Sequence, residues 1–111
     1  MIPSQMLKGI LEGCILKVIS ERETYGYEIL QRLRDHGFSQ ITEGTLYPLL
    51  LRLEKNGFVT VRYRDSDLGP QRKYFSLTAA GEAELRSFSV SWEELTRVVG
   101  RLFQKEGNGH G

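Results

Sequence analysis

The chain has 111 residues, 40% of them hydrophobic and 26% charged, and 15 basic against 14 acidic side chains give a net charge of +1. This composition is that of a globular domain and excludes a wholly disordered or fibrous chain. No apolar run approaches the ~20 residues of a membrane span, and no export signal is visible. The single cysteine, Cys14, excludes an internal disulfide and a thiolate zinc cluster. We therefore expect a small cytoplasmic protein.

Positive charge is concentrated in the middle of the chain. Residues 58–81 carry four basic and two acidic side chains, whereas residues 1–57 are balanced and residues 82–111 have one acidic charge in excess. A local basic patch suits nucleic acid, but an excess of two charges is also typical of a solvated hairpin.

The first half of the chain predicts three helices. Apolar side chains recur there at spacings of three and four, as on one face of a helix. Each helix follows a residue that can cap it, and the second and third end near a glycine. The predicted helices run from Ser4 to Ser20, from Thr24 to Gly37 and from Thr42 to Gly57.

A hairpin and a long helix follow. Residues 59–64 and 72–77 alternate between apolar and polar types, which predicts two strands joined by a turn of about seven residues. Thr78 caps a last helix that ends near Gln104. The predicted parts are a winged-helix domain at 1–77, a C-terminal helix at 78–104 and a disordered tail at 105–111.

This element order predicts a mainly α fold with a small β-hairpin (α+β). Three helices followed by a hairpin form a winged helix-turn-helix, in which the third helix enters the major groove of DNA and the hairpin flanks it.

The last helix carries a seam of apolar residues spaced three and four apart, as in a coiled coil. About 27 residues of helix measure ~40 Å, more than a domain of this size can cover. We therefore predict dimerisation through this seam. The alternative is core packing on the first helix. The seam residues are Leu85, Phe88, Trp92, Leu95, Val99 and Leu102.

Several motifs resemble the short branch of the PadR-like family of bacterial transcription regulators. They are Tyr25-Gly26-Tyr27-Glu28-Ile29, Glu43-Gly44-Thr45-Leu46-Tyr47-Pro48, Gly69-Pro70-Gln71-Arg72-Lys73-Tyr74 and Trp92. The resemblance implies a homodimeric DNA-binding repressor with an N-terminal winged helix and a C-terminal dimerisation helix. It also implies release from DNA by a small aromatic or drug-like effector bound between the C-terminal helices.

Two groups of side chains are candidate contacts to double-stranded DNA. On the third helix a leucine stripe faces the core, so Thr45 and Tyr47 are free for phosphates or base edges. Glu43 either accepts from a cytosine amino group or only complements the helix dipole. Beyond the turn, strand alternation sends Arg72 and Lys73 to opposite faces. The full set is Tyr25, Thr42, Glu43, Thr45, Tyr47, Pro48, Arg52, Gln71, Arg72 and Lys73.

Two of these residues have open roles. Pro48 lies inside the third helix, where it removes an amide donor and crowds the carbonyl of Gly44, so a kink there aims the first turn into the groove. The alternative is packing beside the wing. Arg52 reaches either a phosphate or an acidic neighbour.

An effector pocket is predicted at the seam. Trp92 is either dimer core or one wall of an aromatic-ligand pocket. The bulk of Phe88 argues against an open pore. The predicted lining is Glu12, Leu16, Phe88, Ser89 and Trp92.

The sequence contains no constellation for catalysis, a metal or a cofactor. Cys14 lies on an apolar helix face and is expected to be inert, and His36 and His110 are too far apart in the chain for a ligand motif. We predict a repressor dimer on an inverted repeat with half-sites ~34 Å apart. The alternatives are a winged-helix protein-interaction module without DNA binding, and a small-molecule carrier or adventitious enzyme that uses only the dimer pocket.

Overall fold

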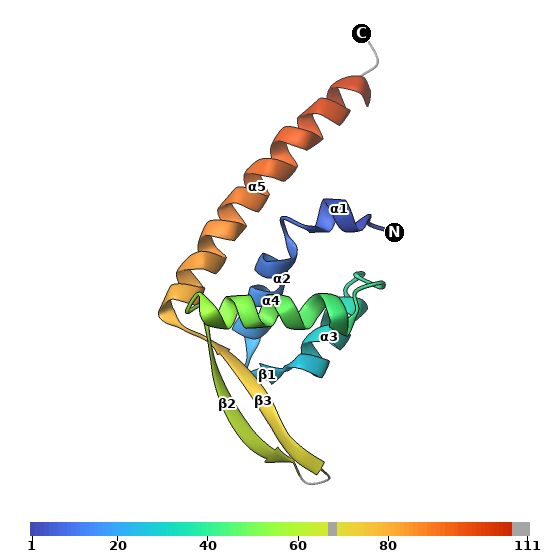
Figure 1. The fold of residues 1–111 in the computed structure, drawn as a ribbon. Coiled ribbons are helices and arrows are strands. Elements are labelled where there is room, and N and C mark those ends of the chain that lie inside the picture. The colour runs from blue at the N-terminus through green and yellow to red at the C-terminus, as the bar shows by residue number, and fades with distance from the viewer. Residues whose placement is uncertain (67–68, 108–111) are drawn as a thin grey trace.

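The computed structural model describes residues 1–66 and 69–107, with side chains placed up to residue 104 except at residue 66. Figure 1 shows a compact body of helices, a hairpin that extends from it and one long helix that leaves it. This arrangement confirms the predicted mainly α winged helix with a long C-terminal helix. The elements in order are α1 (Ser4–Leu7), α2 (Leu11–Glu21), β1 (Thr24–Tyr25), α3 (Gly26–Asp35), α4 (Glu43–Lys55), β2 (Val59–Ser66), β3 (Gly69–Leu77) and α5 (Ala79–Gly107).

The prediction of one continuous helix from Ser4 to Ser20 is wrong. A turn at residues 8–10 separates α1 from α2, and the Ile10 amide donates to the Leu7 carbonyl at 3.0 Å. Pro3 rather than Ser4 is the N-cap residue of α1. Gly9, a poor helix former, lies in the turn. Leu7 still packs against the core, so the apolar spacing continues across the break and does not reveal it.

The helix ends follow local backbone chemistry, with one exception. Thr42 caps α4 as predicted, since its Oγ1 accepts from the Thr45 amide at 3.3 Å. Gly37 and Gly57 follow α3 and α4 with φ of 122° and 80°, which suits glycine. Thr24 does not cap α3: it is a buried strand residue, and its hydroxyl donates to the Glu28 carboxylate.

The sheet has three antiparallel strands in the order β1-β3-β2. The two-residue β1, which is too short for alternation to predict, pairs with β3 at Thr24↔Phe75 and ties the wing to the helical body. Strands β2 and β3 pair from Val59↔Leu77 to Ser66↔Gly69. The predicted turn of about seven residues is therefore too long.

The core lies between α2, α3, α4 and the base of the wing. Leucines at helical spacing turn one face of α4 inward, as predicted, and leave the opposite face in solvent. Side chains that are almost fully buried are Ile15, Leu16, Ile29, Leu30, Leu46, Leu50 and Leu53.

Helix α5 begins where α4 ends. The Thr78 hydroxyl donates to the Gly57 carbonyl at 2.6 Å and accepts from the Gly81 amide at 3.0 Å, which confirms Thr78 as the cap. A Cβ at Gly81 would overlap the Phe58 carbonyl, so only glycine permits this approach. The helix continues to Gly107, three residues beyond the predicted end. Of the predicted tail, residues 105–107 are helical and 108–111 lie outside the described residues.

Two residues of the predicted dimer seam pack within the chain instead. Leu85 lies against the core, and the Phe88 ring lies on Gly13 of α2, where any Cβ would overlap it. The core alternative therefore holds for the first turns of α5. Trp92, Leu95, Val99 and Leu102, which follow on the seam, are exposed.

Because Phe88 packs on Gly13, the effect of Gly13→Ala on the free energy of unfolding should have opposite signs with and without the Phe88 ring. Gly13→Ala in the wild-type chain crowds the ring and lowers the free energy of unfolding by about 1–3 kcal/mol. In a Phe88→Ala background the ring is absent, so the same change raises stability by up to ~1 kcal/mol through helix propensity. Urea unfolding of the four proteins measures both values. The control is Gly9→Ala, whose added methyl meets no other atom within 4 Å. An equal effect of Gly13→Ala in both backgrounds would contradict the packing.

Candidate nucleic-acid interface

The outward face of α4 presents polar and aromatic side chains. Glu43, Thr45, Tyr47 and Leu51 are exposed, as the leucine stripe predicts. Thr45 belongs to the capped first turn, where its hydroxyl lies 3.3 Å from that of Thr42. The helix runs through Pro48 without ending and extends to Lys55. One face of the first turns of α4 is therefore open to solvent, as a groove-reading helix requires.

Tyr47 connects the two glycine-containing motifs. Its phenol ring lies over Gly26, the first residue of α3, and a Cβ on Gly26 would come within 2.7 Å of Cε1 and 2.8 Å of the hydroxyl. A side chain at this position would therefore displace the Tyr47 ring. With 41% of its surface exposed, Tyr47 keeps its hydroxyl beside the N-terminal amides of α3. A helix N-terminus attracts phosphate through free N–H groups and its dipole.

Aromatic rings hold the wing cations in position. The rings of Tyr25 and Tyr74 meet edge to face with centroids 5.3 Å apart. The Arg72 guanidinium lies 4.5 Å from the centroid of Tyr25, and that of Arg64 lies 4.7 Å from the centroid of Tyr74. These cation–π contacts restrict the conformations of both arginines.

Lys73 joins the wing to α4. Its Nζ lies 3.1 Å from the Glu54 carboxylate of α4 and 5.4 Å from the centroid of the Phe75 ring. Alternation predicts that Arg72 and Lys73 face opposite sides of the hairpin, yet both line one groove. Lys73 shares the face of β3 with the buried Phe75, and its ion pair with Glu54 holds it against α4.

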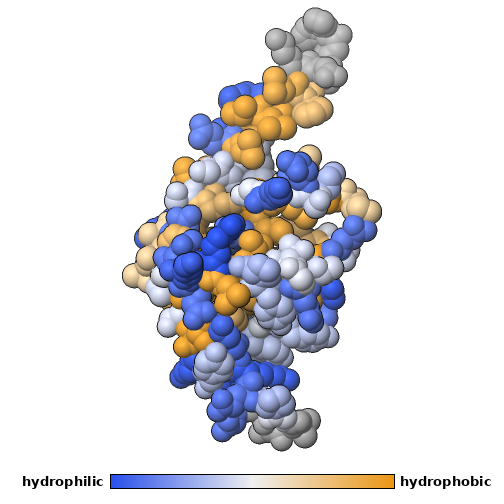
Figure 2. Space-filling view, in the orientation of Figure 1, coloured by the Kyte–Doolittle hydropathy of each residue, from blue (hydrophilic) through white to orange (hydrophobic). Residues whose placement is uncertain are grey.

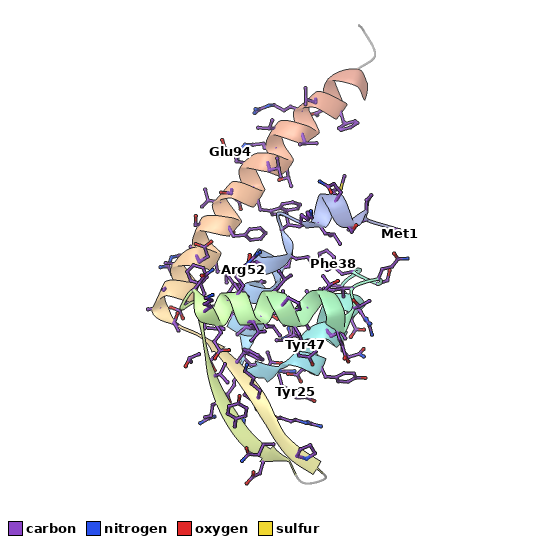
Figure 3. The ribbon with its side chains drawn as sticks, in the orientation of Figure 1. Met1, Tyr25, Phe38, Tyr47, Arg52 and Glu94 are labelled. Atoms are coloured by element: carbon purple, nitrogen blue, oxygen red, sulfur yellow. The ribbon has the colours of Figure 1, made fainter. Side chains whose placement is uncertain are left out.

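This tyrosine–cation groove has a volume of about 430 Å³ and lies between the start of α3, α4 and β3. Figure 3 shows Tyr25 and Tyr47 on the wing side of α4. The groove unites four of the predicted DNA contacts: Tyr25 at the N-cap of α3, Tyr47 on α4, and Arg72 and Lys73 on β3. Its lining is Tyr25, Gly26, Tyr27, Tyr47, Leu50, Leu51, Arg72, Lys73 and Phe75.

The other predicted DNA contacts lie outside the groove. Thr42, Glu43 and Thr45 mark the exposed start of α4. Pro48 is exposed on the same helix, and Gln71 donates to Asp65 at 3.1 Å near the wing tip.

Arg52 is bound to an acidic neighbour. Its Nε and Nη2 donate to the two carboxylate oxygens of Glu12 on α2, each at 3.0 Å. These hydrogen bonds raise the pKa of Arg52 above its ordinary value. Figure 3 shows Arg52 on the edge of α4 away from Tyr25 and Tyr47. The partner is on another helix because tertiary packing brings α2 and α4 together.

The predicted effector residues do not form one pocket within the chain. Leu16 is only 1% exposed and belongs to the core. Glu12 is paired with Arg52, and Phe88 covers Gly13. Ser89 and Trp92 are the two members that lie open on α5.

Glu23 anchors the wing, a role that no local pattern indicates. Its carboxylate accepts from Arg62 at 2.9 Å, from Arg64 at 3.1 Å and from Ser76 at 3.3 Å. The hydrogen bond from Arg62 is the main cause that lowers the pKa of Glu23. The two arginines are therefore engaged in holding the hairpin. The partners are 39 to 53 residues away in sequence, so only the fold reveals them.

Residues 1–66 and 69–107 offer neither a metal site nor a membrane span. No cluster of three His, Cys, Asp or Glu side chains there is suited to a metal ion. Nor has any helix in that part of the chain the length and hydropathy of a membrane span. Burial raises the pKa of the Cys14 thiol, which makes it less reactive.

Comparisons with known proteins point to one class. Residues 15–87 match the model of the "Transcriptional regulator PadR-like family". A PadR-like transcriptional regulator of Bacillus cereus is 47% identical, with a TM-score of 0.83 over 90% of this chain and 97% of that one. Transcriptional regulator Rv3488 of Mycobacterium tuberculosis is 38% identical over 86% of this chain and 88% of its own. The negative transcriptional regulator PadR of Bacillus subtilis is 25% identical over 81% of this chain and 50% of its own length.

The Glu23 network predicts a pH-dependent loss of stability. Because its pKa is lowered on folding, Glu23 stabilises the native state above its unfolded pKa, and this stabilisation disappears as the pH falls through the lower folded value. Glu23→Gln should therefore lower Tm at pH 7 but have progressively less effect below about pH 4.5. Thermal unfolding followed by circular dichroism between pH 7 and pH 3 measures the difference. Glu84→Gln, on the exposed part of α5, is the control, and a Tm difference constant with pH would contradict this assignment.

Proposed function

The chain belongs to the PadR-like family of transcriptional regulators, and we propose that it acts as a homodimeric repressor on an inverted-repeat operator. Membership of this family makes it a DNA-binding transcription regulator and not an enzyme. The role of repressor is supported by the Bacillus subtilis relative, which is named a negative transcriptional regulator. A regulator of this kind works where the chromosome is, so the proposal includes a cytoplasmic location.

The main support for a DNA-binding surface is the tyrosine–cation groove, which lies beside the solvent-exposed face of α4. In this proposal α4 enters the major groove with Glu43 and Thr45 toward the base edges. Tyr47 and the start of α3 bind a backbone phosphate, and Arg72 binds the next one along the wing. The other predicted contacts, Tyr25, Thr42, Pro48, Gln71 and Lys73, position these groups. Arg52 has a lesser part because Glu12 neutralises it.

Dimerisation through α5 is supported by its exposed apolar surface. Figure 2 shows hydrophobic surface along the part of α5 that projects from the body. Trp92, Leu95, Val99 and Leu102 are all more than 40% exposed, and Val98 and Phe103, which the seam does not include, widen the strip. Apolar surface of this extent is typical of an interface. In this proposal, pairing two such helices about a two-fold axis would place the two α4 helices in successive turns of the major groove, ~34 Å apart.

An effector site at the paired α5 helices completes the proposal. Trp92 and Ser89 are exposed there and would face a small aromatic or drug-like compound. Because Phe88 fills the space over Gly13, the ligand would stack on Trp92 and not extend toward Leu16. Binding would favour a dimer whose two reading helices no longer match the operator spacing.

DNA binding should depend on salt and on two groove residues. We expect the purified protein to select an inverted repeat from a random duplex pool and to bind it with an affinity that falls steeply with salt. Tyr47→Phe keeps the ring on Gly26 but removes a hydroxyl, and should weaken binding about three- to tenfold. Arg72→Gln should reduce the salt slope by about one. Fluorescence anisotropy measures both, with Arg101→Gln on α5 as control. Failure to bind any duplex at low salt would contradict DNA reading and favour the protein-interaction module.

A charge within the α5 strip should prevent dimerisation. Leu95→Asp places a carboxylate in the proposed interface, so analytical ultracentrifugation should detect monomers where the parent chain is dimeric. Operator affinity should fall by more than tenfold, since one reading helix binds one half-site. Gln104→Asp adds the same charge nine residues later, on the opposite side of the helix, and should leave the dimer intact. A dimer that tolerates Leu95→Asp would rule out this interface.

A further inference from the structure

The side of α4 opposite its buried leucine stripe is a ridge without polar side chains. Gly44, Pro48 and Leu51 are spaced by four and three residues, which places them on one face of the helix. All three are exposed, and Leu51 has 60% of its surface in solvent. Figure 1 shows α4 lying across the helical body. This apolar ridge is the part of α4 that faces away from that body.

The fold of the chain does not require the glycine at position 44. Its φ is not positive, and a Cβ built on Gly44 would meet only the Thr42 hydroxyl, at an ordinary contact distance of 3.7 Å. At Gly13, Gly26 and Gly81, by contrast, a neighbouring group of the chain would overlap the added Cβ. Glycine also lowers helix stability relative to alanine. The space over Gly44 is therefore open to a group from outside the chain, which can approach the helix backbone closely there.

The side chains of the apolar ridge cannot form hydrogen bonds with base edges. Those of glycine, proline and leucine contain no polar atom, and proline also lacks the amide N–H. Among the groups that bases present in the major groove, the apolar one is the C5 methyl of thymine. Against other edges the ridge would remove donors and acceptors from water without replacing their hydrogen bonds, which is unfavourable.

The apolar ridge is continuous with the tyrosine–cation groove. Leu51 belongs to both, and Tyr47, which directly precedes Pro48, lines the groove as well. A phosphate bound by Tyr47 and the start of α3 would bring the neighbouring base edges against the ridge. The surface that α4 presents next to a bound phosphate is therefore apolar.

From these observations we propose that the apolar ridge reads a thymine methyl group in each half-site of the operator. Leu51 packs on the methyl group, and Pro48 lies beside it without covering a polar edge. Gly44 lets α4 come close enough to the bases for this contact. The inference rests on the proposed function, since it requires α4 in the major groove, and it adds the base that the helix selects.

The test removes single methyl groups from the operator that the full chain selects from a random duplex pool. Each thymine of one half-site is replaced in turn by deoxyuridine, which lacks only the C5 methyl and keeps the base pairing. Fluorescence anisotropy should show about fourfold weaker binding at one position, the value expected for one buried methyl-sized group. Thymines outside the half-sites should show no change.

The contact is assigned to Leu51 by repeating the scan with two variants. Leu51→Ala should bind the parent operator more weakly and should no longer distinguish thymine from uracil at the sensitive position. Val90→Ala is the matched control, because it truncates an exposed apolar side chain of α5. This control should keep both the parent affinity and the fourfold response.

Gly44→Ala separates DNA binding from stability. Alanine is the better helix former, so Tm should rise by up to about 5 °C. Operator affinity should nevertheless fall by more than tenfold, because the added methyl takes the space that the DNA occupies. Gly9→Ala also adds a methyl that meets no other atom within 4 Å, but in the turn between α1 and α2, and should leave operator affinity unchanged.

Four outcomes would overturn the thymine contact while leaving the proposed function in place, because the chain would still bind its operator. They are selected half-sites without thymine, a deoxyuridine scan without effect, an effect that Leu51→Ala retains, and an unchanged operator affinity of Gly44→Ala. Failure to bind any duplex would refute the proposed function and this inference with it.

Discussion

The burial of one leucine stripe on α4 governs the orientation of everything that faces outward. Leu46, Leu50 and Leu53 are almost completely buried, which sets the rotation of the helix about its axis. With that rotation, Tyr47 faces the tyrosine–cation groove, and Thr45, Leu49 and Arg52 share the other side of the helix. Removing even one such side chain from a core costs several kcal/mol, so the helix has no comparable alternative orientation.

The basic side chains of the wing are restrained by contacts with other residues of the protein. Arg62 and Arg64 are bound by Glu23, and Lys73 is bound by Glu54, whereas Arg72 rests on the Tyr25 ring. Much of the positive excess of residues 58–81 therefore fastens the hairpin to the rest of the chain. Restraint of this kind reduces the conformational entropy that binding must remove.

Much of the candidate interface could be predicted from local patterns, but its assembly could not. The cap at Thr42 and the outward position of Tyr47 follow from residue types and helical spacing. The contact of Tyr47 with Gly26, and of Lys73 with Glu54, joins residues about 20 apart in the chain. Glu12 and Arg52 belong to separate predicted sites because nothing in the sequence indicates that α2 and α4 place them together.

The sequence by itself determined the order of the long helices and of the wing strands, most of their ends and the inward face of α4, because these depend on spacing and capping within a few residues. It did not determine which apolar residues of α5 meet the protein's own α2. Leu85, Phe88 and Trp92 continue one seam, yet the first two pack within the chain and the third is exposed. Periodicity shows that a face is apolar but not what covers it. Which α5 residues are covered depends on the length of α2 and on the absence of a side chain at Gly13. Both matter only because the tertiary structure packs α5 against α2.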